Sequence, residues 1–152
     1  MRPADYPLDE FLGDSGLRPA QSIMNMQGIF VQPGTGLSLP HFAEAEGYRI
    51  AHLGGVDVVA VDASGDEAGF YSANSLIVHE GHRGKGLAVA LALWAHQTRT
   101  GVPASRKLSD GGRAALTAAW HVSNGTRTSP WWPQAVPRNS PELPEPHSKK
   151  GP

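Results

Sequence analysis

Residues 76–96 read LIVHEGHRGKGLAVALALWAH and contain the three pieces that decide the fold. The apolar run Leu76-Ile77-Val78 ends an extended segment, and a glycine-rich loop follows over 80–86. The stretch from Leu87 to His96 is apolar almost throughout, as in a helix that is buried on all sides. Ala and Leu dominate it, and both favour helix over strand. The sequence therefore predicts a strand, a tight loop and a buried helix.

A strand, a glycine turn and a helix in this order provide a physical basis for an anion site. Successive N–H groups of the turn converge on one point, and the first helical turn adds unpaired N–H groups and the positive end of the helix dipole. Glycines let the backbone approach an anion without a side chain in the way. Arg83 and Lys85 add formal positive charge. The loop is therefore predicted to bind a phosphate.

Two common phosphate-binding motifs and one metal motif do not fit this loop. A P-loop needs Ser or Thr after its Lys, but Gly86 follows Lys85. A dinucleotide fingerprint that starts at Gly84 needs Gly or Ala where the chain has Val89. The HEGH stretch over 79–82 is one residue shorter than the zinc-binding H-E-x-x-H motif, so no metal site is predicted.

The flanking sequence predicts the rest of the fold. Tyr48 to Leu53 and 56–61 read as strands on either side of a Gly54-Gly55 turn, and 69–78 reads as a third, which gives an antiparallel meander. After the buried helix we expect another strand over 103–108 and a helix from about 110 to 122, with Ser109 as its N-cap. The predicted class is α/β (α+β), with a mixed, mainly antiparallel central sheet flanked by helices.

The 152 residues are enough for one domain of ordinary size. We expect 1–40 to be a helical or irregular N-terminal part of that domain and 41–126 to be its core. Residues 127–152 are rich in proline and are expected to form a largely disordered tail. Trp131 and Trp132 are the exception, because their large apolar side chains can dock on the core.

Composition limits the classes of function. The chain has no cysteine, which excludes disulfides and thiolate catalysis. No apolar run approaches the ~18 residues of a membrane span, and the acidic N-terminus lacks a signal-peptide pattern, so we expect a cytoplasmic protein without a membrane partner. Residues 101–152 carry seven basic and three acidic side chains, which favours an anionic partner such as a nucleotide-like cofactor or a nucleic acid.

A third phosphate-binding pattern does fit the loop. Arg83-Gly84-Lys85-Gly86-Leu87-Ala88 resembles the R/Q-x-x-G-x-G/A signature of the GNAT family of acyl-CoA-dependent acyltransferases. The family's preceding strand reads L-x-V and ends five residues before the Arg, as Leu76 and Val78 do here. One departure is Glu80, where many members carry Pro. The resemblance is close over 76–91 and extends to the order of elements over 48–125.

The resemblance implies an acyl-CoA cofactor and the transfer of an acetyl group from coenzyme A to an amine. In this family the loop amides bind the cofactor pyrophosphate, which here means the amides from Arg83 to Ala88. The preceding strand, Leu76 to Val78, would pair with the pantetheine arm, and an N–H near Val78 would polarise the thioester carbonyl. Ser109 or Asp110 stands near the position of an Asn that contacts the cofactor.

Acyl transfer also needs a base for the amine and an acid for the departing thiolate. His79 and Glu80 follow the strand directly, and either could be the base; histidines titrate near neutral pH. His82 is interpreted as a solvent-side loop residue. Members of the family often place the acid, a Tyr, on the last helix. The corresponding position here is Leu116 or Thr117, so Thr117, His121 or a water would have to replace the Tyr.

Several alternatives stay open at this point. The chain could be a non-catalytic module of GNAT fold that binds acyl-CoA, and the missing Tyr favours this. It also vaguely resembles small phage-encoded GNAT relatives that act on nucleobases, and Trp131 with Trp132 would suit an acceptor that can stack. A nucleic-acid-binding protein that uses the basic tail is a third interpretation. The amine acceptor could be a small molecule or a macromolecule, and the resemblance allows a homodimer.

Overall fold

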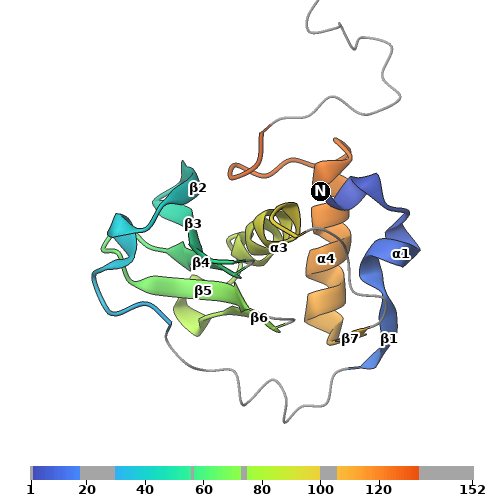
Figure 1. Ribbon diagram of the computed structural model, residues 1–152, viewed down its shortest axis with the longest axis horizontal. Helices are drawn as coiled ribbons and strands as arrows, with labels where there is room; N and C mark the ends of the chain where they lie inside the picture. The colour runs from blue at the N-terminus through green and yellow to red at the C-terminus, as the bar shows by residue number, and fades with distance from the viewer. Residues whose placement is uncertain (1, 18–29, 56, 73–74, 100–105, 134–152) are drawn as a thin grey trace, which may run out of the picture.

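The computed structural model describes residues 2–17, 30–55, 57–72, 75–99 and 106–133. Its centre is a five-stranded sheet in which every neighbouring pair is antiparallel and the strands follow one another in chain order (Figure 1). The strands are β2 (His41–Ala45), β3 (Tyr48–Gly54), β4 (Asp57–Val61), β5 (Glu67–Ser72) and β6 (Ser75–Val78). The predicted α+β fold with a mainly antiparallel central sheet is confirmed.

Parallel pairing occurs outside this sheet. The short strands β1 (Asp14–Leu17) and β7 (Arg106–Leu108) form a separate two-stranded parallel sheet. The strand expected over 103–108 is therefore present in its described part, but its partner comes from the N-terminal region. The sequence predicts a mixed central sheet, but the described pairs of the central sheet are all antiparallel. The parallel pairing occurs in this second, smaller sheet.

The turns between β2 and β3 and between β3 and β4 both contain glycine at positive φ. Gly54 and Gly55, the predicted turn between β3 and β4, both have positive φ, at 141° and 57°. The turn between β2 and β3 uses Glu46 and Gly47, also at positive φ. Such left-handed turns match the twist of antiparallel strands, and glycine adopts them without steric cost.

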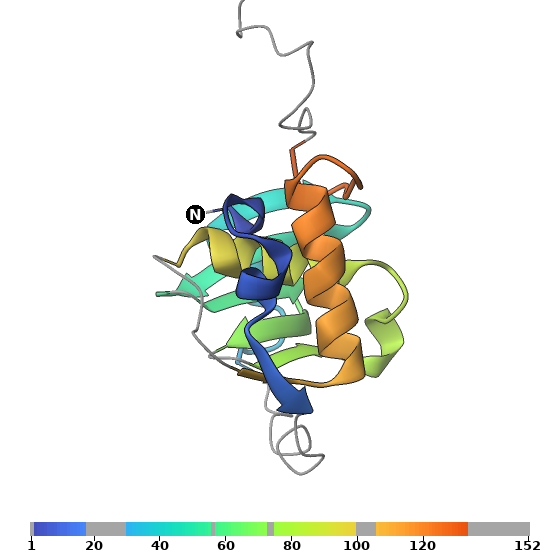
Figure 2. The same ribbon diagram turned by 90° about the vertical axis from the view of Figure 1, so that its right-hand side faces the viewer.

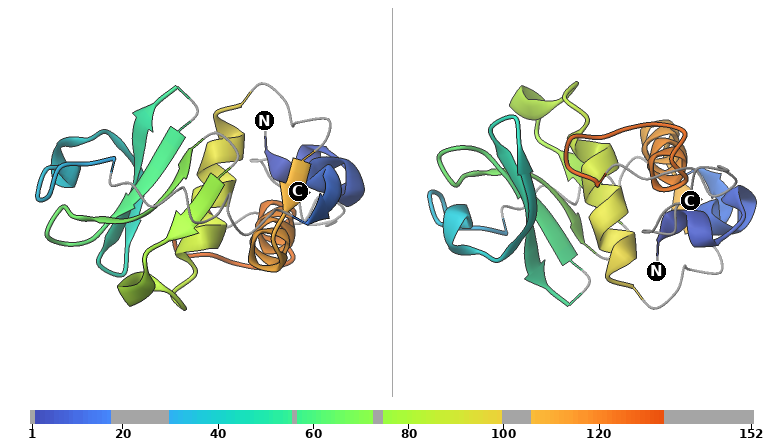
Figure 3. Two further views of the ribbon diagram at one scale, coloured as in Figure 1. Left: turned by 90° about the horizontal axis from the view of Figure 1, so that it is seen from below. Right: turned by 90° about the horizontal axis from the view of Figure 1, so that it is seen from above.

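Two long helices pack in layers on one face of the sheet. The helix α3 (Leu87–Gln97) covers the sheet, and α4 (Asp110–Ser123) packs on the outer side of α3. The short elements η1 (Pro3–Asp5) and α1 (Leu8–Leu12) lie against α4 (Figure 3). Since α3 is enclosed between a sheet and a helix, its apolar surface is buried on both sides, as its sequence predicts.

The opposite face of the sheet is covered in another way. Val31 and Leu39, on either side of η2 (Gly36–Ser38), pack against a second apolar cluster that includes Val59 and Phe70. Among the described residues, no α-helix contributes to this cluster. The described α-helices thus lie on one face of the sheet, while the described segment around η2 covers part of the other.

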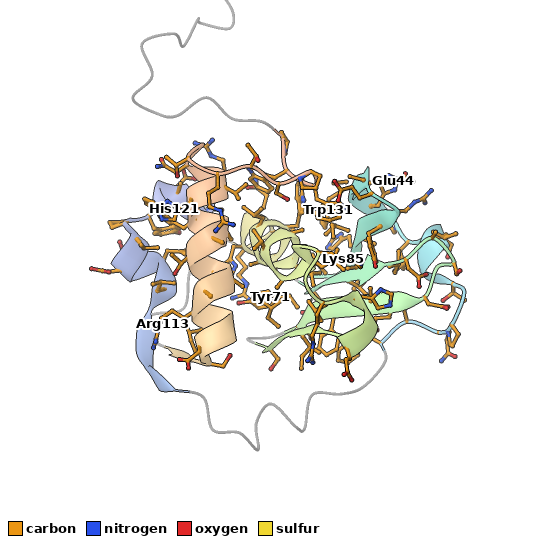
Figure 4. All side chains as sticks on the ribbon, turned by 180° about the vertical axis from the view of Figure 1, so that it is seen from behind. Glu44, Tyr71, Lys85, Arg113, His121 and Trp131 are labelled. Atoms are coloured by element: carbon orange, nitrogen blue, oxygen red, sulfur yellow. The ribbon has the colours of Figure 1, made fainter. Side chains whose placement is uncertain are left out.

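The segment after α4 returns to the core. The Trp131 side chain is 1% exposed, and its indole N–H points at the carbonyl oxygens of Ala45 (3.0 Å) and Tyr48 (3.3 Å) (Figure 4). The Trp131 carbonyl in turn accepts a hydrogen bond from Trp94 on α3 at 2.8 Å. The expected docking of Trp131 therefore occurs, and it ties α3 to the hairpin of β2 and β3. The proline-rich stretch over 134–152 lies outside the described residues.

No helix within the described parts of the chain has the length and apolar character needed to cross a bilayer. Among the described residues, the largest cluster of buried apolar side chains surrounds α3 and includes Trp131.

We predict that Trp131→Ala lowers the free energy of unfolding by about 3–5 kcal/mol, because it opens a cavity in the core and removes the indole donor. Urea denaturation followed by circular dichroism measures this change. The control is Trp132→Ala, whose side chain is only partly buried against Trp94 and should cost less than half as much. Equal losses in the two variants would contradict the assignment of Trp131 as the anchor.

Candidate functional site

The strand β6 has one free edge among the described residues, and its backbone groups there point outward. Val78 lies opposite Gly69 on β5, and the next N–H along, that of His79, donates to Ala68 at 2.8 Å. In this antiparallel register, Val78 and Leu76 direct their N–H and C=O groups away from β5. The Val78 carbonyl confirms the direction, because it accepts a hydrogen bond from the Arg83 guanidinium at 2.9 Å.

The loop after β6 leads directly into the N-terminus of α3. A short turn, η3 (Glu80–His82), is followed by Gly84 and Gly86, whose φ values of 81° and 86° are left-handed and favour glycine. Gly86 is the N-cap of α3, and its carbonyl receives the first helical bond from Ala90. The N–H groups between these two residues have no partner within the helix.

A cavity of about 330 Å³ lies between this loop, the free edge of β6 and the first turn of α4. Figure 2 shows the loop and the N-terminal end of α4 on the same side of the molecule. The lining residues are 76–78 on β6, 82–84 and 86–88 in the loop and α3, and Ser109, Gly111, Gly112 and Ala115 on or just before α4.

The N-termini of two long helices therefore open onto one cavity. Ser109 caps α4 as predicted, since its hydroxyl accepts the Gly112 N–H at 3.0 Å. A side chain added at Gly111 would meet no atom within 4 Å, so the backbone there faces open space. The positive ends of both helix dipoles and the Arg83 side chain make the cavity attractive to an anion.

Most of the predicted cofactor-binding residues meet at this cavity. The cavity wall includes Leu76, Val78, Arg83, Gly84, Gly86, Leu87, Ala88 and Ser109. Lys85 is exposed and does not belong to the wall (Figure 4). Sequence patterns did not indicate Gly111, Gly112 and Ala115, because their contribution depends on how α4 is placed against α3.

His82 corrects an expectation. The sequence predicts a solvent-side loop residue at this position, but His82 is half-buried and lines the cavity. Its Nδ1 atom lies 2.9 Å from the Tyr48 hydroxyl on β3. The tight turn of η3 brings the ring back over the sheet, which sequence spacing alone cannot show.

His79 lies on the other face of the sheet. Side chains alternate along β6, so Leu76 and Val78 face α3, whereas Ile77 and His79 face the cluster around Phe70. The His79 Nε2 atom lies 2.6 Å from the Glu67 carboxylate, which is 1% exposed. Glu67 also accepts the N–H groups of Phe30 (2.7 Å) and Val31 (3.3 Å). Glu67 was not predicted from the sequence, because its residue type and position in a strand do not indicate a contact with His79, twelve residues later.

The other predicted catalytic residues are not brought to the cavity. Glu80 is exposed at the start of η3 and does not line it. Thr117 is also outside the wall. His121 lies eleven residues after Asp110, about 16 Å along the axis of α4, and bonds to Thr126 at 3.0 Å. Arg113 and His121 mark the two ends of this helix in Figure 4.

Among the described residues, no group of three or more His, Asp or Glu side chains could hold a metal ion. In comparisons with known proteins, the chain matches no family model, no curated protein and no solved structure. The functional conclusion therefore depends on the geometry of the cavity and on the sequence of the loop.

We predict that Glu67→Ala lowers the free energy of unfolding by about 2–4 kcal/mol, because the backbone N–H groups of Phe30 and Val31, of which the second is buried, and an imidazole lose their acceptor. The matched control is Glu80→Ala, which removes an exposed carboxylate and should stay within about 0.5 kcal/mol of the parent. Urea denaturation of both variants decides the question. A Glu67 variant as stable as the control would show that this carboxylate does not hold the segment over 30–31 on the sheet.

Proposed function

We propose that this chain is an acyl-CoA-dependent acyltransferase of GNAT type, which moves an acetyl group from coenzyme A to an amine. The observation that carries the proposal is the cavity itself. It combines a free strand edge on one side with a glycine loop at a helix N-terminus on the other. These are the two structures that the resemblance of 76–91 to the GNAT signature requires.

The geometry fits a ligand with an anionic head and an arm that carries amides. The loop and the first turn of α3 offer N–H groups to a pyrophosphate, and Gly84 and Gly86 keep side chains out of its way. The outward N–H and C=O groups of Leu76 can pair with pantetheine amides, as an added strand would, while the Val78 carbonyl is held by Arg83 and the Val78 N–H stays available for the thioester carbonyl. A volume of about 330 Å³ falls within the usual range of small-molecule sites.

The chemical step requires a group that stabilises the carbonyl oxygen of the thioester and a base that deprotonates the amine. The bound thioester supplies the activated acyl group, and the Val78 N–H at the free edge can stabilise negative charge on its carbonyl oxygen. The amine must lose a proton before it attacks, and we assign this role to His79 because Glu67 holds its ring and Glu80 has no such partner among the described residues. Glu67 accepts at His79 Nε2, which leaves Nδ1 to receive that proton. The amine nitrogen then bonds to the thioester carbon, the C–S bond breaks, and the coenzyme A thiolate leaves and takes its proton from water.

A second candidate function is an acyl-CoA-binding module without turnover. One observation favours it: the polar side chains in the cavity wall are those of His82, Arg83 and Ser109, and none of them is a Tyr or a carboxylic acid. A nucleobase acceptor has lost part of its support. Trp131 is buried and Trp132 packs on Trp94, so the pair does not form a free stacking platform.

The first test is calorimetric titration with acetyl-CoA. We expect binding at micromolar levels by the parent and a loss of about tenfold or more in Gly111→Glu, because Gly111 lines the cavity and the substitution puts a negative charge beside an anion site. Gly111 has ordinary backbone dihedrals and open space beside it, so the substitution leaves the fold intact.

The matched control is Gly81→Glu, which adds the same charge at an exposed glycine outside the cavity wall and should bind like the parent. Absence of binding by the parent would refute the acyl-CoA assignment. Equal affinities for the two variants would place the cofactor elsewhere on the surface.

Turnover separates the enzyme from the binding module. Because the chain has no cysteine, a thiol-reactive dye reports only the coenzyme A that is released. We expect thiol release from acetyl-CoA in the presence of at least one amine among a polyamine, a lysine peptide and an aminonucleoside, and a fall of about a hundredfold in His79→Ala without a change in Kd. Binding without thiol release from any of these amines would favour the module.

A further inference from the structure

The His82 side chain is held between the sheet and the cavity. Its Nδ1 atom lies 2.9 Å from the hydroxyl of Tyr48, and the two rings meet edge to face, with centroids 5.6 Å apart and planes at 88°. The same ring is part of the cavity wall, beside Arg83 and Gly84. One nitrogen of the imidazole is thus engaged by the protein, while the ring borders the space where an anion would lie.

The second ring nitrogen, Nε2, has no hydrogen-bond partner among the described residues. It is also not a buried unsatisfied atom, so solvent or a ligand can reach it. A neutral imidazole carries its proton on one nitrogen and accepts on the other. When the Tyr48 hydroxyl donates to Nδ1, the proton resides on Nε2, and that atom becomes a donor toward the cavity.

Tyr48 is itself fixed. It begins β3, its carbonyl accepts the Trp131 indole N–H at 3.3 Å, and its ring packs against the ring of Trp131. Trp131 also lies near Gly86, since its ring is 3.8 Å from the point where a side chain at that residue would begin. The chain of contacts from Trp131 through Tyr48 to His82 therefore sets the ring in one orientation.

We propose that His82 is a ligand-binding residue of the cavity, which donates a hydrogen bond from Nε2 to a phosphoryl oxygen, and that Tyr48 positions it by fixing the tautomer. The inference rests on the anion-binding part of the proposed function and adds a side chain that the loop signature does not contain. It assigns the ligand class as a pyrophosphate-bearing molecule that is contacted from the η3 side as well as from α3.

The groups around the ring support a donor in this place. The wall also contains Arg83, but the Nε atom of this side chain is engaged by the Val78 carbonyl. Lys85 lies outside the wall, and Glu80 is exposed at the start of η3. His82 thus differs from the other polar side chains of the wall. Its Nε2 atom is open to the cavity, and Tyr48 on β3 fixes the ring through Nδ1.

Two substitutions separate the two nitrogens. The amide of glutamine extends to about the position of Nε2, whereas the shorter amide of asparagine reaches only that of Nδ1. We expect His82→Asn to weaken the binding of inorganic pyrophosphate and acetyl-CoA by about tenfold or more, since a hydrogen bond to a charged group is lost. His82→Gln should stay within about threefold of the parent, because it keeps the donor at the cavity. Calorimetry gives the Kd values, and thermal unfolding checks the fold of both variants.

Tyr48→Phe tests whether Tyr48 positions His82. The measured quantity is the tautomer of the His82 ring, which a change in fold stability alone would not alter. Nitrogen NMR, recorded at a pH where histidine side chains are neutral, should show the proton of His82 on Nε2 in the parent, and the variant should show both tautomers together with an affinity about threefold weaker. A parent with its proton on Nδ1 would overturn the role of Tyr48.

The two probes keep the outcomes distinguishable. If both His82 variants bind pyrophosphate like the parent, or lose affinity equally, the Nε2 contact is refuted. The same holds if the parent does not bind pyrophosphate. If pyrophosphate binding depends on His82 as expected but acetyl-CoA does not bind, the acyltransferase proposal fails while the anion contact stands.

Discussion

The structure depends on the burial of α3 between the sheet and α4. Apolar side chains cover this helix on all sides, and the seven buried residues include Leu87 in the first turn and His96 in the last. Because both ends are packed, the helix cannot slide or tilt freely, and its N-terminus is fixed relative to the free edge of β6. A site made of backbone N–H groups needs this, since the direction of each group is set by the position of the helix rather than by a rotamer.

The C-terminal segment reinforces that placement from the far side. Trp131 reaches the carbonyls of the hairpin between β2 and β3 with its indole and approaches Gly86 with its ring. Gly69 has a related role within the sheet, because a side chain there would come within 2.6 Å of the Ile77 carbonyl on β6. The close approach of β5 and β6 thus requires glycine at that position, and it holds the edge strand where the cavity needs it.

Much of this arrangement could be predicted from the sequence, and the reasons are local. The Gly54-Gly55 turn, the apolar α3 and the Ser109 cap all arise from interactions within a few residues, which spacing and residue type express directly. The contribution of Gly111 and the partners of His79 and His82 could not be predicted. Each depends on a contact between elements far apart in the chain, as between Tyr48 and His82 or between Glu67 and His79. A single sequence does not specify such contacts.

In the proposed function, β6 separates recognition from acid–base chemistry. The cavity wall is mostly backbone and small residues, so helix dipoles and N–H groups make up most of its attraction for an anion, and the side chains of His82 and Arg83 add to it. The Glu67–His79 pair lies on the opposite face of the sheet. His79 directly follows Val78 in the chain. Since the outward groups of Val78 lie in the plane of the sheet, a thioester held at that edge is open to both faces. The cofactor can then occupy the side of α3 while the amine approaches from the side of Glu67 and His79, so the absence of an acid from the cavity wall does not by itself argue against catalysis.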